Sequence, residues 1–215
     1  MDGSPEPSSV ELVRRLAGEN DYLVAADRGA EMLYAAGVEP DVFCGDADSV
    51  SPEVAAWAHA SARTDIRFPS EKYATDLALA IDCARHEAAR RGAQLQLTMT
   101  CASGGRPDHV LAVLGQLAAS ADAKARIVED SYECRVLSPC GASSWMVGDE
   151  EGALGATLSA IALRPDTVIS ERGLKWELDH RRMELLGDLG ISNVVMEPSA
   201  EVVCHDGVLA VFLVR

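Results

Sequence analysis

Short, almost entirely apolar segments that each stop at an acidic turn constrain the fold of this chain more than any other feature. Residues 22–26 form one such segment and end at Asp27, and residues 42–44 form another that ends at the turn 45–49. The stretches between them place apolar residues at helical spacing. Strands that are apolar on both faces are typical of a parallel sheet covered by helices, so the pattern predicts alternating strands and helices.

The alternation continues to about residue 117, and the character of the sequence then changes. We expect helices at residues 9–18, 30–36, 52–60, 75–91 and 110–117, and strands at residues 22–26, 42–44, 64–68 and 94–100. Beyond residue 121, turns rich in Gly, Pro and Asp separate expected strands at residues 125–128, 134–137, 144–147, 157–163 and 202–214. We therefore expect an α/β protein with a doubly wound, mostly parallel α/β sheet domain over residues 1–122, followed by a smaller all-β, sandwich-like domain over residues 123–215.

The charge of the chain argues against several classes of partner. Its 215 residues include 19 Lys and Arg against 34 Asp and Glu, a formal net charge of −15 at pH 7. DNA, RNA and anionic membrane surfaces bind clustered positive charge, so none of them is expected as a partner. The first residues lack the pattern of a signal peptide, and no apolar stretch approaches the roughly 18 residues of a membrane span. We expect a cytoplasmic protein.

Four carboxylates stand at the ends of expected elements in the first domain: Asp46 and Asp48 in G-D-x-D-S, Asp76, and Asp108 in G-G-R-x-D-H. The carboxyl ends of parallel strands meet at one edge of a sheet, and carboxylates gathered there repel one another unless a cation lies between them. Such oxygen ligands suit Mg²⁺, which also binds phosphate oxygens. Each of these Asp residues alone also fits a helix cap or an Asx turn.

Basic and aromatic residues near these acids suggest ligand chemistry. Arg28, Lys72 and Arg106 could bind phosphate oxygens, although each also fits an ordinary surface role. In the second domain, Trp176 and the Ser192–Asn193 pair are suited to stacking on a flat heteroaromatic substrate and to hydrogen bonding with it. Ordinary packing of the Trp is the alternative.

Taken in order, these motifs resemble those of the thiamine pyrophosphokinase family. The resemblance runs from about residue 9 to the end of the chain, and it rests on residues 25–30 (A-A-D-R-G-A), 40–41, 45–49 (G-D-A-D-S), 71–72, 75–76, 104–109 (G-G-R-P-D-H), 173–176 (G-L-K-W) and 192–193. It implies transfer of the pyrophosphoryl group of ATP to the hydroxyl of thiamine, giving thiamine diphosphate and AMP. It also implies a homodimer whose active sites are shared between the subunits.

The resemblance further implies roles for individual residues. The implied catalytic carboxylates are Asp46, Asp48, Asp76 and Asp108, of which the first three would hold Mg²⁺ and Asp76 is a candidate for accepting the hydroxyl proton. The implied ATP contacts are Asp27, Arg28, Lys72, Thr75, Arg106 and His109. The implied thiamine contacts are Trp176, Ser192 and Asn193, with Trp176 against the aminopyrimidine ring.

Two other functions stay open. The same ATP half suits a pyrophosphokinase that acts on another hydroxylated heterocycle, such as a pterin, although residues 173–176 and 192–193 favour thiamine. A catalytically silent nucleotide-binding dimer is the third reading. It is favoured by the lack of a counterpart to the family's first strand ahead of Ser8, and by Tyr73 where the family often has Asp. The four carboxylates favour catalysis.

Overall fold

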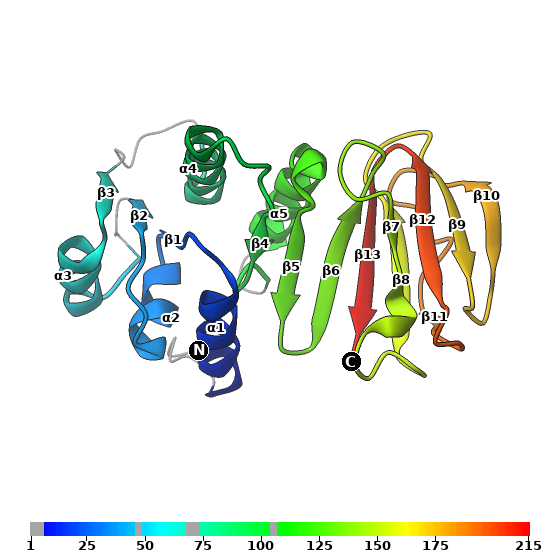
Figure 1. The fold of residues 1–215 in the computed structure, drawn as a ribbon, viewed down its shortest axis with the longest axis horizontal. Coiled ribbons are helices and arrows are strands. Elements are labelled where there is room, and N and C mark those ends of the chain that lie inside the picture. Colours follow the sequence, from blue (N-terminus) through cyan, green and yellow to red (C-terminus); the bar gives the residue numbers. More distant parts are fainter. Residues whose placement is uncertain (1–6, 46–48, 68–73, 104–106) are drawn as a thin grey trace. The chain divides into compact units, whose positions relative to one another are not determined.

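The structure is a computed structural model that describes residues 7–45, 49–67, 74–103 and 107–215 (Figure 1). Its internal contacts divide the chain into two compact units, Met1–Leu95 and Gln96–Arg215. Within the described ranges, no helix is both long enough and apolar enough to cross a membrane.

The first unit alternates helices and strands, as the sequence predicts. Its elements are α1 (Pro7–Glu19), β1 (Val24–Ala26), α2 (Gly29–Ala36), β2 (Val42–Gly45), α3 (Pro52–Ser61), β3 (Thr64–Arg67) and α4 (Asp76–Arg91). The three strands form a parallel sheet in the order β1-β2-β3 (Figure 1). Val42 lies opposite Val24 on one side and Thr64 on the other.

Alternate residues of β1 and β2 pack against different helices. Ala25 and Phe43 belong to a buried cluster with side chains of α1, α2 and α3. Val42 and Cys44 pack instead with Ala80 of α4. Because successive side chains of a strand point to opposite faces, helices contact both faces of these two strands. This explains why the strand sequences are apolar throughout.

The second unit is rich in antiparallel strands. Its elements are β4 (Thr98–Met99), α5 (Pro107–Ala119), η1 (Ala121–Ala123), β5 (Arg126–Glu129), β6 (Tyr132–Leu137), β7 (Ser144–Trp145), η2 (Val147–Asp149), β8 (Thr157–Ala162), β9 (Val168–Arg172), β10 (Leu178–Arg182), β11 (Asn193–Val194), β12 (Glu201–Asp206) and β13 (Leu209–Val214). They form a six-stranded sheet in the order β11-β8-β13-β6-β5-β4 and a four-stranded sheet in the order β10-β9-β12-β7. The described strands pair antiparallel except for β4 and β5, which are parallel.

Three features of this unit differ from the sequence expectation. The strand expected at residues 94–100 is only two residues long, and it pairs with β5 rather than with the first sheet. The expected strand at 202–214 is two strands, β12 and β13, which belong to different sheets. Strands β9, β10 and β11 were not predicted from the sequence, and of these β10 is largely exposed and lacks alternating apolar residues. β4 and α5 thus lie in the β-rich unit, and the domain boundary at 122/123 stays a prediction.

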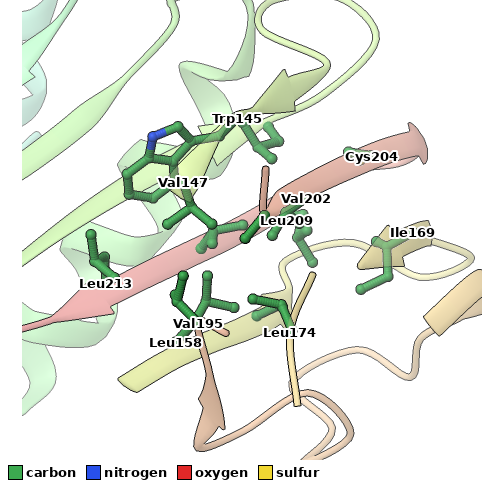
Figure 2. Packing of buried hydrophobic residues seen from close by; sticks show 14 of the residues in the cluster. Trp145, Val147, Leu158, Ile169, Leu174, Val195, Val202, Cys204, Leu209 and Leu213 are labelled. Carbon is green, nitrogen blue, oxygen red and sulfur yellow. The ribbon is translucent and has the colours of Figure 1, made fainter. Parts of the chain in front are cut away.

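Side chains from both sheets of the second unit share one apolar core (Figure 2). Leu158 and Leu209 come from the six-stranded sheet, and Ile169 and Val202 from the four-stranded sheet. All four side chains are fully buried. Burial of each such side chain stabilises the fold by roughly 1.5 to 3 kcal/mol relative to its exposure to water. This core holds together the two sheets of the second unit, which position the Trp176 and Asn193 segments.

Gly207 joins β12 to β13, and both its backbone angle and its surroundings require glycine. Its φ is 81°, and a Cβ added there would lie 2.8 Å from Cα of Thr167. We predict that Gly207→Ala lowers the free energy of unfolding by about 2 to 4 kcal/mol, because left-handed strain and a backbone clash add together.

Gly155 provides the matched control for this substitution. It has the same φ of 81°, and no heavy atom of the described residues lies within 4 Å of an added Cβ. Gly155→Ala should therefore lose only the strain energy, about 1 to 2 kcal/mol. Urea denaturation of both variants measures the difference, and equal losses would show that the clash at Gly207 is unimportant.

Candidate functional site

The carboxyl ends of β1 and β2 lie side by side in the first unit. Asp27 follows β1 with a left-handed φ of 46°, and its N–H donates a hydrogen bond to the carbonyl of Cys44 at 2.9 Å. At the end of β2, a Cβ added to Gly45 would lie 3.3 Å from Cα of Asp27. The two turns are therefore in close contact, and the glycine keeps this approach open.

The carboxylate of Asp27 has one satisfied and one unsatisfied oxygen. The hydroxyl of Ser49 donates a hydrogen bond to Oδ2. Oδ1 is buried, and it has no hydrogen-bond partner among the residues that the structure describes. A buried carboxylate oxygen without a partner is costly, so this atom fits a site that receives a cation or a hydrogen-bond donor. Ser49 was not singled out as a site residue, although it stands in G-D-A-D-S.

Asp76 begins α4 beside the same end of the sheet. Thr75 caps the helix, since its Oγ1 accepts a hydrogen bond from the N–H of Ala78 at 3.2 Å. The carbonyl oxygen of Asp76 lies 4.0 Å from the thiol sulfur of Cys44, the residue before Gly45. The start of α4 thus reaches the edge that carries Asp27. The positive end of a helix dipole in such a position favours an anion such as phosphate.

The other residues expected at the phosphate site are placed in three ways. Arg28 occupies the N-cap position of α2 and is exposed. Asp108 and His109 lie in the first turn of α5, in the second unit, and are exposed. Four residues lie outside the described ranges, so their positions stay predictions: Asp46, Asp48, Lys72 and Arg106.

Of the three residues predicted to hold Mg²⁺, the structure describes only Asp76, because Asp46 and Asp48 fall outside the described ranges. Among residues 7–45, 49–67, 74–103 and 107–215, no group of three or more His, Cys, Asp or Glu is arranged to hold a metal ion. The Mg²⁺ ligand set therefore stays a prediction.

The turn between β4 and α5 is tied to the neighbouring strand. Oε1 of Glu129, at the end of β5, accepts hydrogen bonds from the N–H groups of Ala102 and Ser103 at 2.8 and 3.3 Å. This carboxylate fixes the main chain shortly before Asp108. Sequence reasoning did not find Glu129, because nothing in residues 126–129 marks it as a turn anchor.

Trp176 is an exposed aromatic side chain in the second unit, with 56% of its surface accessible. The ammonium nitrogen of Lys175 lies 4.5 Å from the centroid of its ring, a cation–π contact. An exposed indole of this kind provides a flat surface for stacking on a heteroaromatic ligand.

The segment that carries Trp176 lies beside the segment that carries Asn193. The N–H of Lys175 donates to the carbonyl of Val194 at 2.9 Å, and the N–H of Met196 donates to that of Gly173 at 3.0 Å. Leu174 and Val195 are both buried in the core that Figure 2 shows. The G-L-K-W and S-N motifs, distant in sequence, are therefore adjacent.

Asn193 holds the main chain of Trp176 on both sides. Its Oδ1 accepts hydrogen bonds from the N–H groups of Trp176 and Val194 at 3.1 and 2.9 Å. Its Nδ2 donates to the carbonyl of Trp176 at 2.7 Å and to Oε2 of Glu171 at 2.9 Å. These four bonds use the whole capacity of the amide. Asn193 is 2% exposed, whereas Ser192 beside it is exposed. Their direct thiamine contacts stay predictions.

Glu171 is a buried carboxyl group that sequence reasoning missed. It lies in β9 with 0% of its surface exposed, and its Oε1 has no hydrogen-bond partner within the described part of the chain. Burial raises the pKa of this carboxyl group to about 7, while the hydrogen bond from Asn193 acts in the opposite direction. In sequence, Glu171 stands between Ser170 and Arg172 and carries no signal of burial.

Comparison with known proteins finds two matching family models. The family model described as "Thiamin pyrophosphokinase, catalytic domain" matches residues 13–128, just over half of the chain. The model described as "Thiamin pyrophosphokinase, vitamin B1 binding domain" matches residues 147–209, which include Trp176 and Asn193. No curated protein sequence matches significantly.

Solved structures with a similar fold carry related names. A thiamin pyrophosphokinase family protein from Enterococcus faecalis is 27% identical, with 93% of this chain and 91% of that chain covered and a TM-score of 0.75. Thiamin pyrophosphokinase from Geobacillus thermodenitrificans is also 27% identical, with 94% and 90% covered and a TM-score of 0.74. The enzyme from Candida albicans shares the fold at 19% identity, with 94% and 85% covered and a TM-score of 0.75. The resemblance inferred from the motifs is thus confirmed: the chain belongs to the thiamin pyrophosphokinase family.

Proposed function

We propose that this chain transfers the pyrophosphoryl group of ATP to the hydroxyl of thiamine, forming thiamine diphosphate and AMP. The observation that carries the proposal is that one chain matches both a pyrophosphokinase catalytic domain and a vitamin B1 binding domain. The two halves of the reaction thus each have a domain. The intact set of carboxylates favours this activity over a silent nucleotide-binding dimer.

The first unit supplies Asp27, Arg28, Thr75 and Asp76 to the phosphate side of the proposed reaction. The hydroxyl of thiamine must attack the β-phosphorus in line with the departing AMP oxygen, so catalysis is mainly positioning and neutralisation of charge. Asp27 and Asp76 support the proposal because they lie at one end of the sheet. Asp46, Asp48 and Asp76 would hold Mg²⁺, which when bound would neutralise the triphosphate. Further ATP contacts are proposed for Arg28, Lys72, Thr75, Arg106 and His109, with Asp108 as the fourth catalytic carboxylate.

The second unit supplies the thiamine side. The exposed indole of Trp176 is proposed to stack on the aminopyrimidine ring, with Ser192 as a hydrogen-bonding contact. Thiamine carries a positive thiazolium, and a chain with a net charge of −15 attracts a cation. The G-L-K-W and S-N segments favour thiamine over a pterin-like acceptor.

We further propose a cytoplasmic homodimer with shared active sites. The support is an exposed group of large apolar residues near Trp176 in the sequence, which a partner surface would cover: Leu185, Leu186, Leu189, Ile191 and Met196.

We also propose that the first sheet is doubly wound, and the support is that helices contact both faces of β1 and β2. For the second unit we propose a sandwich-like arrangement, and the support is that its two sheets share a core.

A product assay tests the proposed function. The protein is incubated with ATP, Mg²⁺ and thiamine, and AMP and thiamine diphosphate are followed by chromatography. We expect both products to form in equal amounts. AMP formed only with a pterin-like acceptor would establish the second reading, and no AMP with any acceptor would establish the silent dimer.

Removing one carboxylate from the phosphate side should abolish most turnover. We predict that Asp76→Asn lowers kcat at least about 100-fold, because the amide keeps the shape of the side chain but loses its charge. Asp46→Ala should act in the same direction. Asp82→Asn, farther along α4 and exposed, is the matched control and should keep full activity. Near-normal turnover in Asp76→Asn with an intact fold would remove Asp76 from the metal site.

Removing the indole should weaken thiamine binding selectively. We predict that Trp176→Ala raises the KM for thiamine about tenfold or more, because stacking of an aromatic pair is lost, while the KM for ATP changes little. Trp176→Phe should recover part of the loss. Leu154→Ala is the control, since Leu154 is 57% exposed, nearly the same as Trp176. A thiamine KM that is unchanged in Trp176→Ala would refute the stacking role.

A further inference from the structure

We infer that Glu171 is a positioning residue of the thiamine site, acting through the side-chain amide of Asn193 on the main chain of Trp176. The inference rests on the proposed function, because it takes Trp176 as the surface on which thiamine stacks. Glu171 itself binds Asn193 at 2.9 Å, and Asn193 binds both the N–H and the carbonyl of Trp176. Glu171 is therefore one step removed from the indole.

The carboxyl group selects one orientation of the Asn193 amide. A carboxylate accepts hydrogen bonds, so Oε2 of Glu171 pairs with the NH₂ group of Asn193 and not with its oxygen. This leaves Oδ1 facing the N–H groups of Trp176 and Val194. If the amide turned over, its NH₂ group would face two N–H donors and its oxygen would face two acceptors. Glu171 thereby opposes the wrong orientation.

The main chain at Trp176 depends on this amide because the indole is exposed. Leu174, two residues earlier, is held by the apolar core, and the N–H of Lys175 is paired with Val194. The N–H and carbonyl of Trp176 are instead bound by the side chain of Asn193. A loosened amide would therefore be felt first at Trp176, and a stacking surface loses affinity when it is not held in place.

The ionisation of Glu171 should change the strength of this support. Burial brings the pKa of its carboxyl group to about 7. An ionised acceptor forms a stronger hydrogen bond than a neutral one, so Asn193 is held more firmly above that pH. A negative charge also favours a cationic ligand. The stronger hydrogen bond and the negative charge should both favour thiamine binding above pH 7. The KM for thiamine should therefore fall as the pH rises through 7.

The charged neighbours of Glu171 come from each element beside β9. Those that line one pocket with it are Arg172 on β9, Glu177 before β10, Asp179 on β10, and Glu197 and Glu201 near or on β12. Strand β11 contributes only Asn193 and Val194. On β12, His205 contacts the hydroxyl of Ser170, whose side chain points to the opposite face, and His180 of β10 stacks on His205.

Glu201→Gln is the matched control for Glu171→Gln. It removes a carboxylate that lines the same pocket and makes no described contact with Asn193.

Selective labelling of asparagine tests the inference without any activity. The chain contains two asparagines, Asn20 and Asn193, so ¹⁵N-asparagine gives two side-chain amide signals. Asn20 donates to the carbonyl of Leu16 and serves as the internal reference. We expect the Asn193 signal to shift with a midpoint near pH 7 while that of Asn20 does not. The shift should vanish in Glu171→Gln and persist in Glu201→Gln. An Asn193 signal that does not titrate near neutral pH, or that titrates unchanged in Glu171→Gln, would overturn the inference.

Kinetics supply the second measurement. At pH 8, Glu171→Gln should raise the KM for thiamine by up to about tenfold, with little change in kcat. A factor of ten is the change in binding that corresponds to one pKa unit. At pH 6 it should match the unmodified protein, because both carry a neutral side chain at residue 171. Glu171→Leu removes the acceptor and should raise the KM at both values. Equal thiamine KM values at pH 8 in a folded Glu171→Gln and the unmodified protein would contradict the positioning role.

The two measurements separate this inference from the proposed function. Absence of thiamine diphosphate formation by the unmodified protein would refute the function, while the Asn193 titration would still report the link between Glu171 and Asn193. Thiamine diphosphate formation with an Asn193 signal insensitive to Glu171 would leave the function standing and refute the positioning role.

Discussion

Main-chain groups at the ends of helices and strands have no partner within their own element, and the chain must satisfy them in another way. Both proposed sites lie where this happens. The N–H of Asp27 binds the carbonyl of Cys44, and Thr75 caps α4. In the second unit, Glu177 accepts a hydrogen bond from the N–H of Gly173, and Asn193 binds both groups of Trp176. The side chains that complete the fold are thus neighbours of the side chains proposed to bind substrate.

Glu171 shows that part of the stability is given up at such a place. Its pKa is raised from 4.5 to about 7, so the folded chain holds this proton more tightly than the unfolded chain does. Stability therefore falls as the pH rises from about 4.5 to 7, and the loss is complete above that range, at roughly 3 kcal/mol. An apolar residue facing Leu178 and Val202 would avoid this cost. A buried carboxyl group that binds Asn193 is better explained by the orientation that it imposes on the amide.

Much of the first unit could be predicted from the sequence, because its strands and helices carry strong periodic signals. The apolar segments before Asp27 and Gly45 are β1 and β2, and the parallel sheet brings their ends together as expected. The second unit was harder. β10 is a short, exposed strand whose side chains are mostly polar, and its pairing with β9 depends on main-chain bonds that leave no sequence pattern. The apolar run at residues 202–214 predicts a single strand, whereas the structure divides it at Gly207 into β12 and β13, which belong to different sheets.

The sequence by itself determined the class of fold, the family and the residue types that the chemistry requires, because these depend on periodicity and on motifs that are local in the chain. Only the tertiary structure decided which other side chains hold those residues in place. It joined Trp176 to Asn193, and Asn193 to Glu171, across three segments of the second unit. Burial and hydrogen-bond pairing arise from contacts between distant segments. The identity of residue 171 as Glu therefore does not by itself indicate whether its side chain is solvated or buried.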